Sequence, residues 1–208
     1  MSNLFHMAAL RAGALGLLSG EQGAAPRVYG PTEERILGAT LRLLGRRGVK
    51  RLAMQEVSEV AGVSRGTLYR YFPSKDQLLA GVAEFDERRF TVGLARAFEG
   101  VDDPVERVKA LVSFAFDYIR THPARSLFGS EPDFVLGYLL SHLPKLEDAL
   151  LEQLGDAFDA MPVVAGGWAS RRQVADIIVR LFTSSFVIPE PDDRVLVQSI
   201  NAILLHVS

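Results

Sequence analysis

The sequence predicts an all-α fold: an N-terminal three-helix domain that contains a helix-turn-helix, followed by a C-terminal helical bundle. From Pro31 to the end, apolar residues recur at helical spacing, and no stretch shows the period-two alternation of a β-strand. The one long segment without a helical pattern is rich in glycine and proline and covers residues 19–30. We therefore expect an extension over residues 1–30, a first domain over 31–82 and a second domain over 83–208.

The composition is that of an ordinary globular protein. Of the 208 residues, 48% are hydrophobic and 23% are charged, which excludes a disordered or low-complexity chain. The absence of cysteine excludes disulfides, thiol nucleophiles and cysteine-bound zinc. No apolar run approaches the length of about 18 residues that crosses a bilayer, so the sequence predicts no membrane span.

Charge is distributed unevenly along the chain. Residues 31–83 hold nine Lys and Arg against five Asp and Glu, a net charge of +4, whereas residues 84–208 carry a net charge of −7. A compact basic segment ahead of an acidic body is expected when one part of a protein meets a polyanion. The same +4 is also compatible with an ordinary solvated surface, so charge alone does not decide between the two.

The first predicted helix begins at Pro31. We expect Thr32 to cap its N-terminus, with Glu33 and Glu34 in the first turn, where acidic side chains interact favourably with the helix dipole. Gly48 is expected to end the helix in the left-handed conformation. The apolar face of this helix is formed by Ile36, Leu37, Ala39, Leu43 and Leu44.

The pattern over about residues 53–72 predicts a helix-turn-helix. A short amphipathic helix ends at Gly62, and a tight turn leads to Ser64 as the N-cap of a second short helix. Pro73 disfavours helical geometry at the residue before it, so the second helix stops at Phe72. Two short helices joined by a turn of three or four residues that contains glycine form this unit.

The second helix of the unit is expected to enter the major groove of DNA, with its N-terminal residues at the base edges. Gly66 costs about 0.5–1 kcal/mol relative to alanine inside a helix, which is explicable where the backbone must come close to DNA. Lys75, together with free N–H groups of the next helix, suits a phosphate. Alternatively, these residues are only the exposed face of a small domain. The predicted DNA-binding residues are Arg65, Gly66, Thr67, Tyr69, Arg70, Tyr71 and Lys75.

The segment AGVSRGTLYRYFPSKDQLL closely resembles the signature of TetR-family transcriptional repressors, and Thr32–Gln77 matches the family's DNA-binding domain. At the matching positions, the resemblance implies DNA contacts by Arg65, Thr67, Tyr69, Tyr71 and Lys75. It also implies that the C-terminal domain binds a small effector and dimerises through its last two helices. We therefore expect a homodimeric, ligand-responsive repressor of double-stranded operator DNA, in the cytoplasm and associated with the nucleoid.

Two features depart from the pattern of this family. The family usually has Thr and then Ser or Thr just before its second helix, whereas this chain has Leu52 and Ala53. We expect the missing N-cap hydroxyl to cost about 1 kcal/mol and to remove a phosphate contact. The other departure is the extension ahead of the first helix, which either packs loosely or is disordered, or else reaches DNA through Arg11 and Arg27.

The rest of the chain predicts a series of helices separated by short turns. Ser74 and Gln77 form a capping box that opens the first of them. Proline or glycine lies in most of the turns between them. The expected ranges are 75–99, 104–121, 130–141, 145–160, 171–187 and 193–207.

The last two predicted helices are expected to form the dimer contact. In residues 195–208, apolar side chains occur nearly all round the helix, whereas a surface helix needs only one apolar stripe. Two such helices from each subunit would form a four-helix interface about a two-fold axis. Alternatively, both sides are buried within one chain. The predicted dimer residues are Val174, Ile178, Leu181, Phe182, Ile200, Ile203 and Leu204.

Aromatic residues concentrate between residues 114 and 138, which predicts an apolar effector cavity. Such a lining favours a small apolar effector, for example an acyl chain, because a buried charge would need partners that are scarce here. The alternative is that these aromatic residues are ordinary core. The predicted effector-binding residues are Phe114, Tyr118, Phe134, Tyr138 and Trp168, with His122, Arg125, Asp133 and His142 as polar groups that could orient a ligand.

No sequence motif indicates an enzyme. The four histidines are scattered, and we find no metal-ligating, phosphate-binding or nucleophile motif. We therefore expect no catalytic residue, no metal and no cofactor. Three alternatives to a repressor stay open: a transcriptional activator, a DNA-organising protein, and a helical module that sequesters a small molecule without binding an operator.

Overall fold

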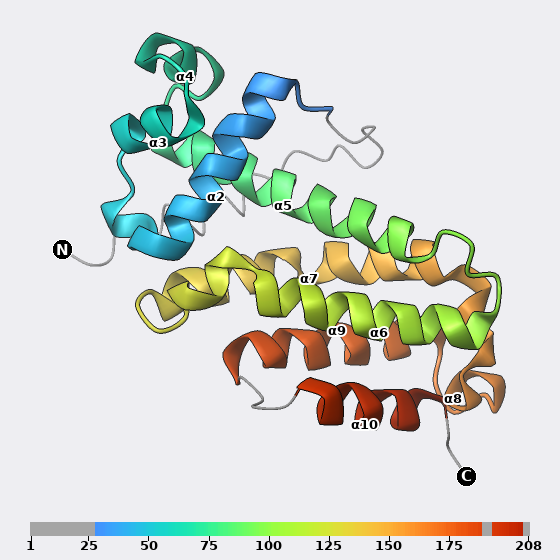
Figure 1. Ribbon diagram of the computed structural model, residues 1–208. Coiled ribbons are helices and arrows are strands. Elements are labelled where there is room, and N and C mark those ends of the chain that lie inside the picture. The colour runs from blue at the N-terminus through green and yellow to red at the C-terminus, as the bar shows by residue number, and fades with distance from the viewer. Residues whose placement is uncertain (1–27, 189–192, 206–208) are drawn as a thin grey trace. The chain divides into compact units, whose positions relative to one another are not determined.

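The computed structural model describes residues 28–188 and 193–205, and every regular element in these ranges is a helix (Figure 1). The all-α prediction is thereby confirmed, while residues 1–27 of the predicted extension and 206–207 of the last predicted helix lie outside the described residues. In chain order, the elements are α2 (Pro31–Arg51), α3 (Met54–Ala61), α4 (Arg65–Tyr71), α5 (Lys75–Ala97), α6 (Pro104–Thr121), the 3₁₀ helix η1 (Pro123–Leu127), α7 (Pro132–Leu154), the 3₁₀ helix η2 (Gly155–Ala160), α8 (Pro162–Ala165), α9 (Arg171–Val187) and α10 (Asp193–Leu205).

The described chain divides into two compact units. Unit 1 comprises residues 28–89 and 123–141, and unit 2 comprises 90–122, 142–188 and 193–205. The first unit is therefore larger than the domain expected over 31–82, because it also takes in a stretch from the middle of the chain. This stretch contains η1 and the first part of α7, which sequence periodicity alone could not assign to either unit.

Unit 1 begins before the first helix. Tyr29 is buried, and its hydroxyl donates a hydrogen bond to the Glu84 carboxylate at 3.1 Å. Gly30 is the N-cap of α2 and Pro31 is its first helical residue, so the expectation that Thr32 caps this helix is wrong. Proline suits that first position because its φ is already helical and it has no N–H to leave unpaired.

The helix-turn-helix is formed by α3 and α4, as predicted (Figure 1). Gly62 ends α3 in the left-handed conformation, with φ 64° and ψ 40°. Ser64 caps α4, since its Oγ accepts a hydrogen bond from the Thr67 N–H at 3.0 Å. Leu68 and Phe72 are buried in the core of unit 1 and fix which face of α4 is turned outward.

The backbones of α2 and η1 approach each other closely at a glycine. A Cβ atom on Gly45 would lie 2.4 Å from the Pro123 carbonyl oxygen, closer than real Cβ contacts allow. Ser126, also in η1, donates its hydroxyl hydrogen to the Gly45 carbonyl oxygen. The absence of a side chain at Gly45 is therefore what lets η1 pack on α2.

We expect Gly45→Ala to lower the free energy of unfolding by about 1–3 kcal/mol, because the added methyl group meets main chain rather than a movable side chain. Gly38→Ala in the same helix is the matched control, since the nearest atom to its Cβ would be Arg42 Nη1 at 3.6 Å. Alanine there should stabilise the helix by about 0.5–1 kcal/mol. Urea unfolding of both variants measures the two effects, and equal stabilities would contradict the close approach.

Unit 2 is a helical bundle in which α6 packs against α9, α10 and η2. The ring of Phe116 in α6 meets that of Phe182 in α9 edge-on, with centroids 5.7 Å apart. Phe158 within η2 and Met161 just after it are fully buried in the same core. These contacts bury one face of α6, α9 and α10 together.

The two helices predicted over 130–141 and 145–160 are one helix in the structure. α7 continues through Pro144, which lies inside it. Only the last part of the predicted range 145–160 forms a separate element, the 3₁₀ helix η2. A proline in a helix removes one backbone hydrogen bond and favours a kink, but it does not force the chain out of the helix. The expected break at Pro144 is therefore wrong.

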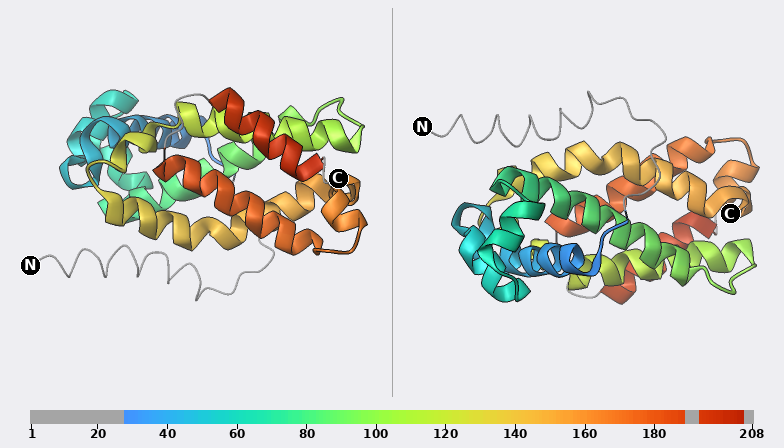
Figure 2. Two further views of the ribbon diagram at one scale, coloured as in Figure 1. Left: turned by 90° about the horizontal axis from the view of Figure 1, so that it is seen from below. Right: turned by 90° about the horizontal axis from the view of Figure 1, so that it is seen from above.

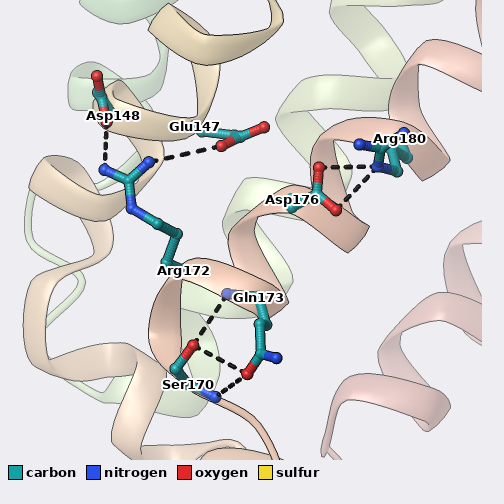
Figure 3. Close-up of polar contacts among 7 residues, drawn as sticks. All are labelled: Glu147, Asp148, Ser170, Arg172, Gln173, Asp176 and Arg180. Atoms are coloured by element: carbon teal, nitrogen blue, oxygen red, sulfur yellow. Dashed lines mark hydrogen bonds and ion pairs between the residues drawn. The ribbon is translucent and has the colours of Figure 1, made fainter.

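Polar contacts fix the start of α9 on the outside of unit 2 (Figure 3). Ser170 and Gln173 form a capping box, in which Ser170 Oγ accepts from the Gln173 N–H and the Gln173 side chain accepts from the Ser170 N–H. Arg172 reaches α7, where its Nη2 lies 2.8 Å from Asp148 Oδ1 and its Nη1 lies 3.7 Å from Glu147 Oε2. These exposed ion pairs orient α9 but contribute little to stability.

In the part of the chain that the structure describes, no helix is long and apolar enough to cross a membrane. The same residues contain no group of three or more His, Asp or Glu side chains that could hold a metal ion.

Candidate DNA-binding site

The outward face of α4 carries most of the predicted DNA-binding residues. Arg65 and Tyr69 lie one turn apart on this helix, and the Tyr69 side chain is 48% exposed. Gly66 and Arg70 are also exposed. An exposed tyrosine beside exposed arginines on a short, well-anchored helix is an arrangement that can meet both base edges and phosphates.

Gly66 has open space where a side chain would lie. The nearest atom to a Cβ at this position is Ser64 Oγ, at an ordinary van der Waals distance of 3.8 Å. Nothing within the described protein therefore requires glycine here, and its φ is not in the left-handed region. Gly66 thus differs from Gly45, where the Pro123 carbonyl group fills the space.

The remaining predicted residues of α4 are partly engaged within the protein. The Thr67 hydroxyl lies 2.9 Å from Ser64 Oγ, so it takes part in the cap as well as facing outward. Tyr71 is 37% exposed, and the Arg70 guanidinium lies over its ring at 5.4 Å from the centroid. This cation–π contact pre-orients Arg70 and Tyr71 toward the same surface.

Lys75 is held by the backbone just before α3. Its Nζ donates to the carbonyl oxygens of Val49 at 2.5 Å and Leu52 at 2.9 Å. Burial lowers the pKa of the Lys75 ammonium, and the negative charges of Glu131 and Asp76 partly oppose that shift. Because two of its three N–H donors serve the protein, only one is left for the phosphate that the sequence predicts.

The two positions that depart from the family pattern lie just before α3. Leu52 is buried in the core of unit 1, and the Ala53 N-cap makes no side-chain hydrogen bond. A hydroxyl side chain at position 52 would replace a core contact. A hydroxyl side chain at position 53 would add a cap that this chain lacks. The cationic side chains that lie closest in sequence to the start of α3 are those of Lys50 and Arg51, and both are exposed.

Glu131 is a residue of unit 1 that sequence reasoning did not identify. Its Oε1 accepts a hydrogen bond from the Lys50 N–H at 3.1 Å. The two residues are separated by 81 positions, so no local pattern could have joined them.

The predicted effector-binding residues do not share one unit. In unit 2, the rings of Phe90, Phe114 and Tyr118 contact one another in tilted or edge-on geometry and Tyr118 also contacts His122, with ring centroids 5.2–5.8 Å apart. Trp168 is 72% exposed, so its predicted place in a cavity lining is corrected. It follows Gly167, which has a positive φ of 72°, in the loop before α9.

Phe134 and Tyr138 belong to unit 1, where they pack against its core. The Tyr138 hydroxyl donates to Asp86 Oδ2 at 3.3 Å. Burial, followed by the adjacent Asp86 carboxylate, raises the pKa of the Tyr138 hydroxyl well above its ordinary value. A tyrosine paired in this way acts as a structural donor in unit 1.

Most of the predicted dimer residues are core residues of unit 2. Five of them are buried within the single chain, and this part of the prediction is corrected: Val174, Ile178, Phe182, Ile200 and Leu204. Ile203 is 65% exposed and Leu181 is half-buried, so these two remain available at the surface. Ile177 on α9 and Val195 on α10 are further exposed apolar side chains of these two helices.

Comparison with known proteins identifies the family. The model of the bacterial regulatory proteins of the tetR family matches residues 36–82, which cover most of α2, the helix-turn-helix and the start of α5. An uncharacterized HTH-type transcriptional regulator of Mycobacterium tuberculosis is 26% identical over 79% of this chain and 80% of its own length. The HTH-type transcriptional repressor KstR of Rhodococcus jostii is 36% identical over 45% of this chain and 43% of its own.

Solved structures share the fold over nearly the whole chain. The fatty acid degradation regulator FadR from Bacillus halodurans superposes with a TM-score of 0.63 at 20% identity, covering 86% of this chain and 97% of FadR. AibR, solved in complex with isovaleryl coenzyme A and operator DNA, gives a TM-score of 0.57 at 18% identity and covers 84% of this chain and 98% of AibR. Residues 36–82, which contain the helix-turn-helix, thus match the DNA-binding segment of the tetR family of bacterial regulatory proteins, and the chain shares the fold of these solved regulators.

Proposed function

We propose that this DNA-binding regulator is a homodimeric repressor that a small apolar effector releases from its operator. The observation that carries the proposal is the surface of α4, where Arg65, Gly66, Tyr69 and Arg70 are exposed while Leu68 anchors the helix in the core. The family's relatives are named as transcriptional regulators and repressors, which supports regulation rather than catalysis. Its place of action would be the cytoplasm, at the nucleoid.

Each subunit would place residues 65–71 in the major groove of one half-site. In a two-fold symmetric dimer the half-sites are then related by the same symmetry, with centres about 34–36 Å apart or a multiple of that distance. Phosphate contacts by the basic side chains would release counterions and make the affinity fall with salt.

The effector would bind in unit 2. Phe90, Phe114 and Tyr118 are half-buried and pack together beside the buried His122, which leaves this unit a partly exposed aromatic surface. AibR was solved with isovaleryl coenzyme A, and FadR is a regulator of fatty acid degradation, which supports an effector with an acyl chain. Effector binding would favour a conformation with lower operator affinity, by thermodynamic linkage.

Selection of binding sites from a random pool of duplex DNA tests the proposal. We expect enrichment of a two-fold symmetric sequence, followed by tight, competitor-resistant binding of the selected duplex at two salt concentrations. Acyl-CoA thioesters of increasing chain length, with free coenzyme A as the control, would then be screened for release of that duplex. Failure to enrich any sequence would overturn operator binding, and release by coenzyme A alone would overturn the apolar effector.

Gly66→Ala is expected to weaken operator binding while leaving the fold slightly more stable. The added methyl group meets no protein atom closer than 3.8 Å, and alanine favours a helix by about 0.5–1 kcal/mol. Against DNA the same methyl group would hold the backbone of α4 away from the groove, so we expect a loss of about tenfold or more in affinity. Titration of the selected duplex and thermal unfolding measure the two effects, and unchanged affinity would show that α4 does not approach DNA at this position.

A further inference from the structure

The turn that connects α2 to α3 is held from two sides. It begins at Gly48, whose φ of 78° and ψ of 169° break the helical geometry of α2. Within it, the Leu52 N–H donates to the Val49 carbonyl oxygen at 3.2 Å. This one backbone bond does not hold the turn alone, since the Lys50 N–H and the two carbonyls bound by Lys75 also find partners in side chains from elsewhere in unit 1.

Glu131 holds the N–H side of the turn. Besides accepting the bond from the Lys50 N–H, its Oε1 lies where a side chain on Gly48 would be, 2.2 Å from an ideal Cβ. The carboxylate therefore covers Gly48 and also binds the N–H of Lys50, two residues further on. Glu131 lies between η1 and α7, in the stretch that joins unit 1 from the middle of the chain.

Lys75 holds the carbonyl side of the same turn through Val49 and Leu52. Leu52 is buried in the core, and α3 starts two residues later at Met54. The turn thus sets where α3 begins, and α3 packs directly on α4. Any loosening of the turn would be transmitted to the helix that is expected to contact DNA.

We propose that Glu131 is a positioning residue for operator binding, which acts by fixing the turn of residues 48–52 beneath the helix-turn-helix. This inference rests on the proposed function. Glu131 itself does not touch DNA in this proposal. Its contribution is the hydrogen bond to the Lys50 N–H, which keeps the start of α3 in the geometry that the operator requires.

Removal of the Glu131 carboxylate should change operator affinity in the direction opposite to that expected from charge alone. Removing a carboxylate from a basic DNA-binding unit reduces repulsion of the phosphates, so simple electrostatics predicts tighter binding. Loss of a positioning hydrogen bond predicts weaker binding, by about tenfold. Since no phosphate contact is lost, the dependence of affinity on salt should keep the slope of the wild type.

The experiment compares three variants on the duplex that the wild-type protein selects from a random pool. Glu131→Ala removes both the acceptor and the charge, and Glu131→Gln removes the charge but keeps an oxygen acceptor for the Lys50 N–H. Glu34→Ala is the charge-matched control, because Glu34 is an exposed carboxylate of unit 1 in the first turn of α2. The active fraction of each protein is measured by stoichiometric titration, so that partial unfolding is separated from a change in Kd.

We expect Glu131→Ala to bind about tenfold more weakly at an unchanged salt slope, with Glu131→Gln and Glu34→Ala within about twofold of the wild type. Wild-type or tighter binding by Glu131→Ala would overturn the proposal, as would Glu131→Gln binding as weakly as Glu131→Ala. If Glu131→Ala fails to fold, the Glu131→Gln result decides alone, because the hydrogen bond predicts retained affinity. A wild-type protein that selects no sequence would instead overturn the proposed function, and this inference with it.

Discussion

Replacing Arg65 and Tyr69 together by alanine is expected to abolish sequence-specific binding while the protein stays folded and dimeric. The two residues lie one helical turn apart at the start of α4, where neither contributes to the core of unit 1. A well-placed contact to a base edge is worth about 1–3 kcal/mol, so loss of both should reduce operator affinity by about a hundredfold or more. Residual binding should resemble the non-specific binding of any basic surface.

Competition titration with the selected duplex and with a scrambled duplex measures this loss. Arg96→Ala provides a control for the lost charge, because Arg96 is exposed near the end of α5, in unit 2 rather than unit 1. This variant should bind as the wild type does. Unchanged discrimination between the two duplexes by the double variant would show that α4 is not the reading helix.

The helix-turn-helix could be predicted from the sequence because its signals are local. Gly62 ends one helix, Ser64 caps the next, and Pro73 limits its length, each within a few residues of the feature that it controls. The buried positions Leu68 and Phe72 follow from helical spacing alone. Local rules of this kind also explain why the family resemblance falls on this segment.

Features that depend on distant contacts could not be predicted in this way. Glu131 reaches Lys50 across 81 positions, and Gly45 is determined by the backbone of η1, which lies far along the chain. Pro144 suggested a break in α7 because proline disfavours helix interiors on average, but α7 continues through it. Sequence periodicity shows which residues are apolar, but it does not show which unit they join.

The same limit explains the corrected dimer residues. On α9 and α10 the apolar positions occupy more than one face, and the sequence cannot tell the face that packs on α6 from the face that remains outside. The structure separates them: Ile178 is 1% exposed, whereas Ile177 beside it is 51% exposed. α10 lies beside α9 in Figure 1 and in the left view of Figure 2, so Ile177 and Ile203 belong to neighbouring helices of one unit.

A double variant with glutamate at Ile177 and Ile203 is expected to be monomeric and to lose operator affinity by about a hundredfold or more. Both side chains are exposed in the single chain, so glutamate costs little in the monomer but would place unpaired charges in an apolar dimer contact. A monomer engages only one half-site. In a dimer, binding of the first α4 helix raises the effective concentration of the second at its half-site, and a monomer lacks this gain.

Light scattering coupled to gel filtration measures the oligomeric state, and titration of the selected duplex measures affinity. Val92→Glu is the control for an added charge on unit 2, because Val92 is exposed on α5 rather than on α9 or α10. Ile178→Ala gives the contrasting result, a loss of about 2–5 kcal/mol in the free energy of unfolding with the dimer retained, since that residue fills the core. A dimeric glutamate double variant would show that the subunits meet through another surface, and the exposed faces of α9 and α10 would then have no part in operator binding.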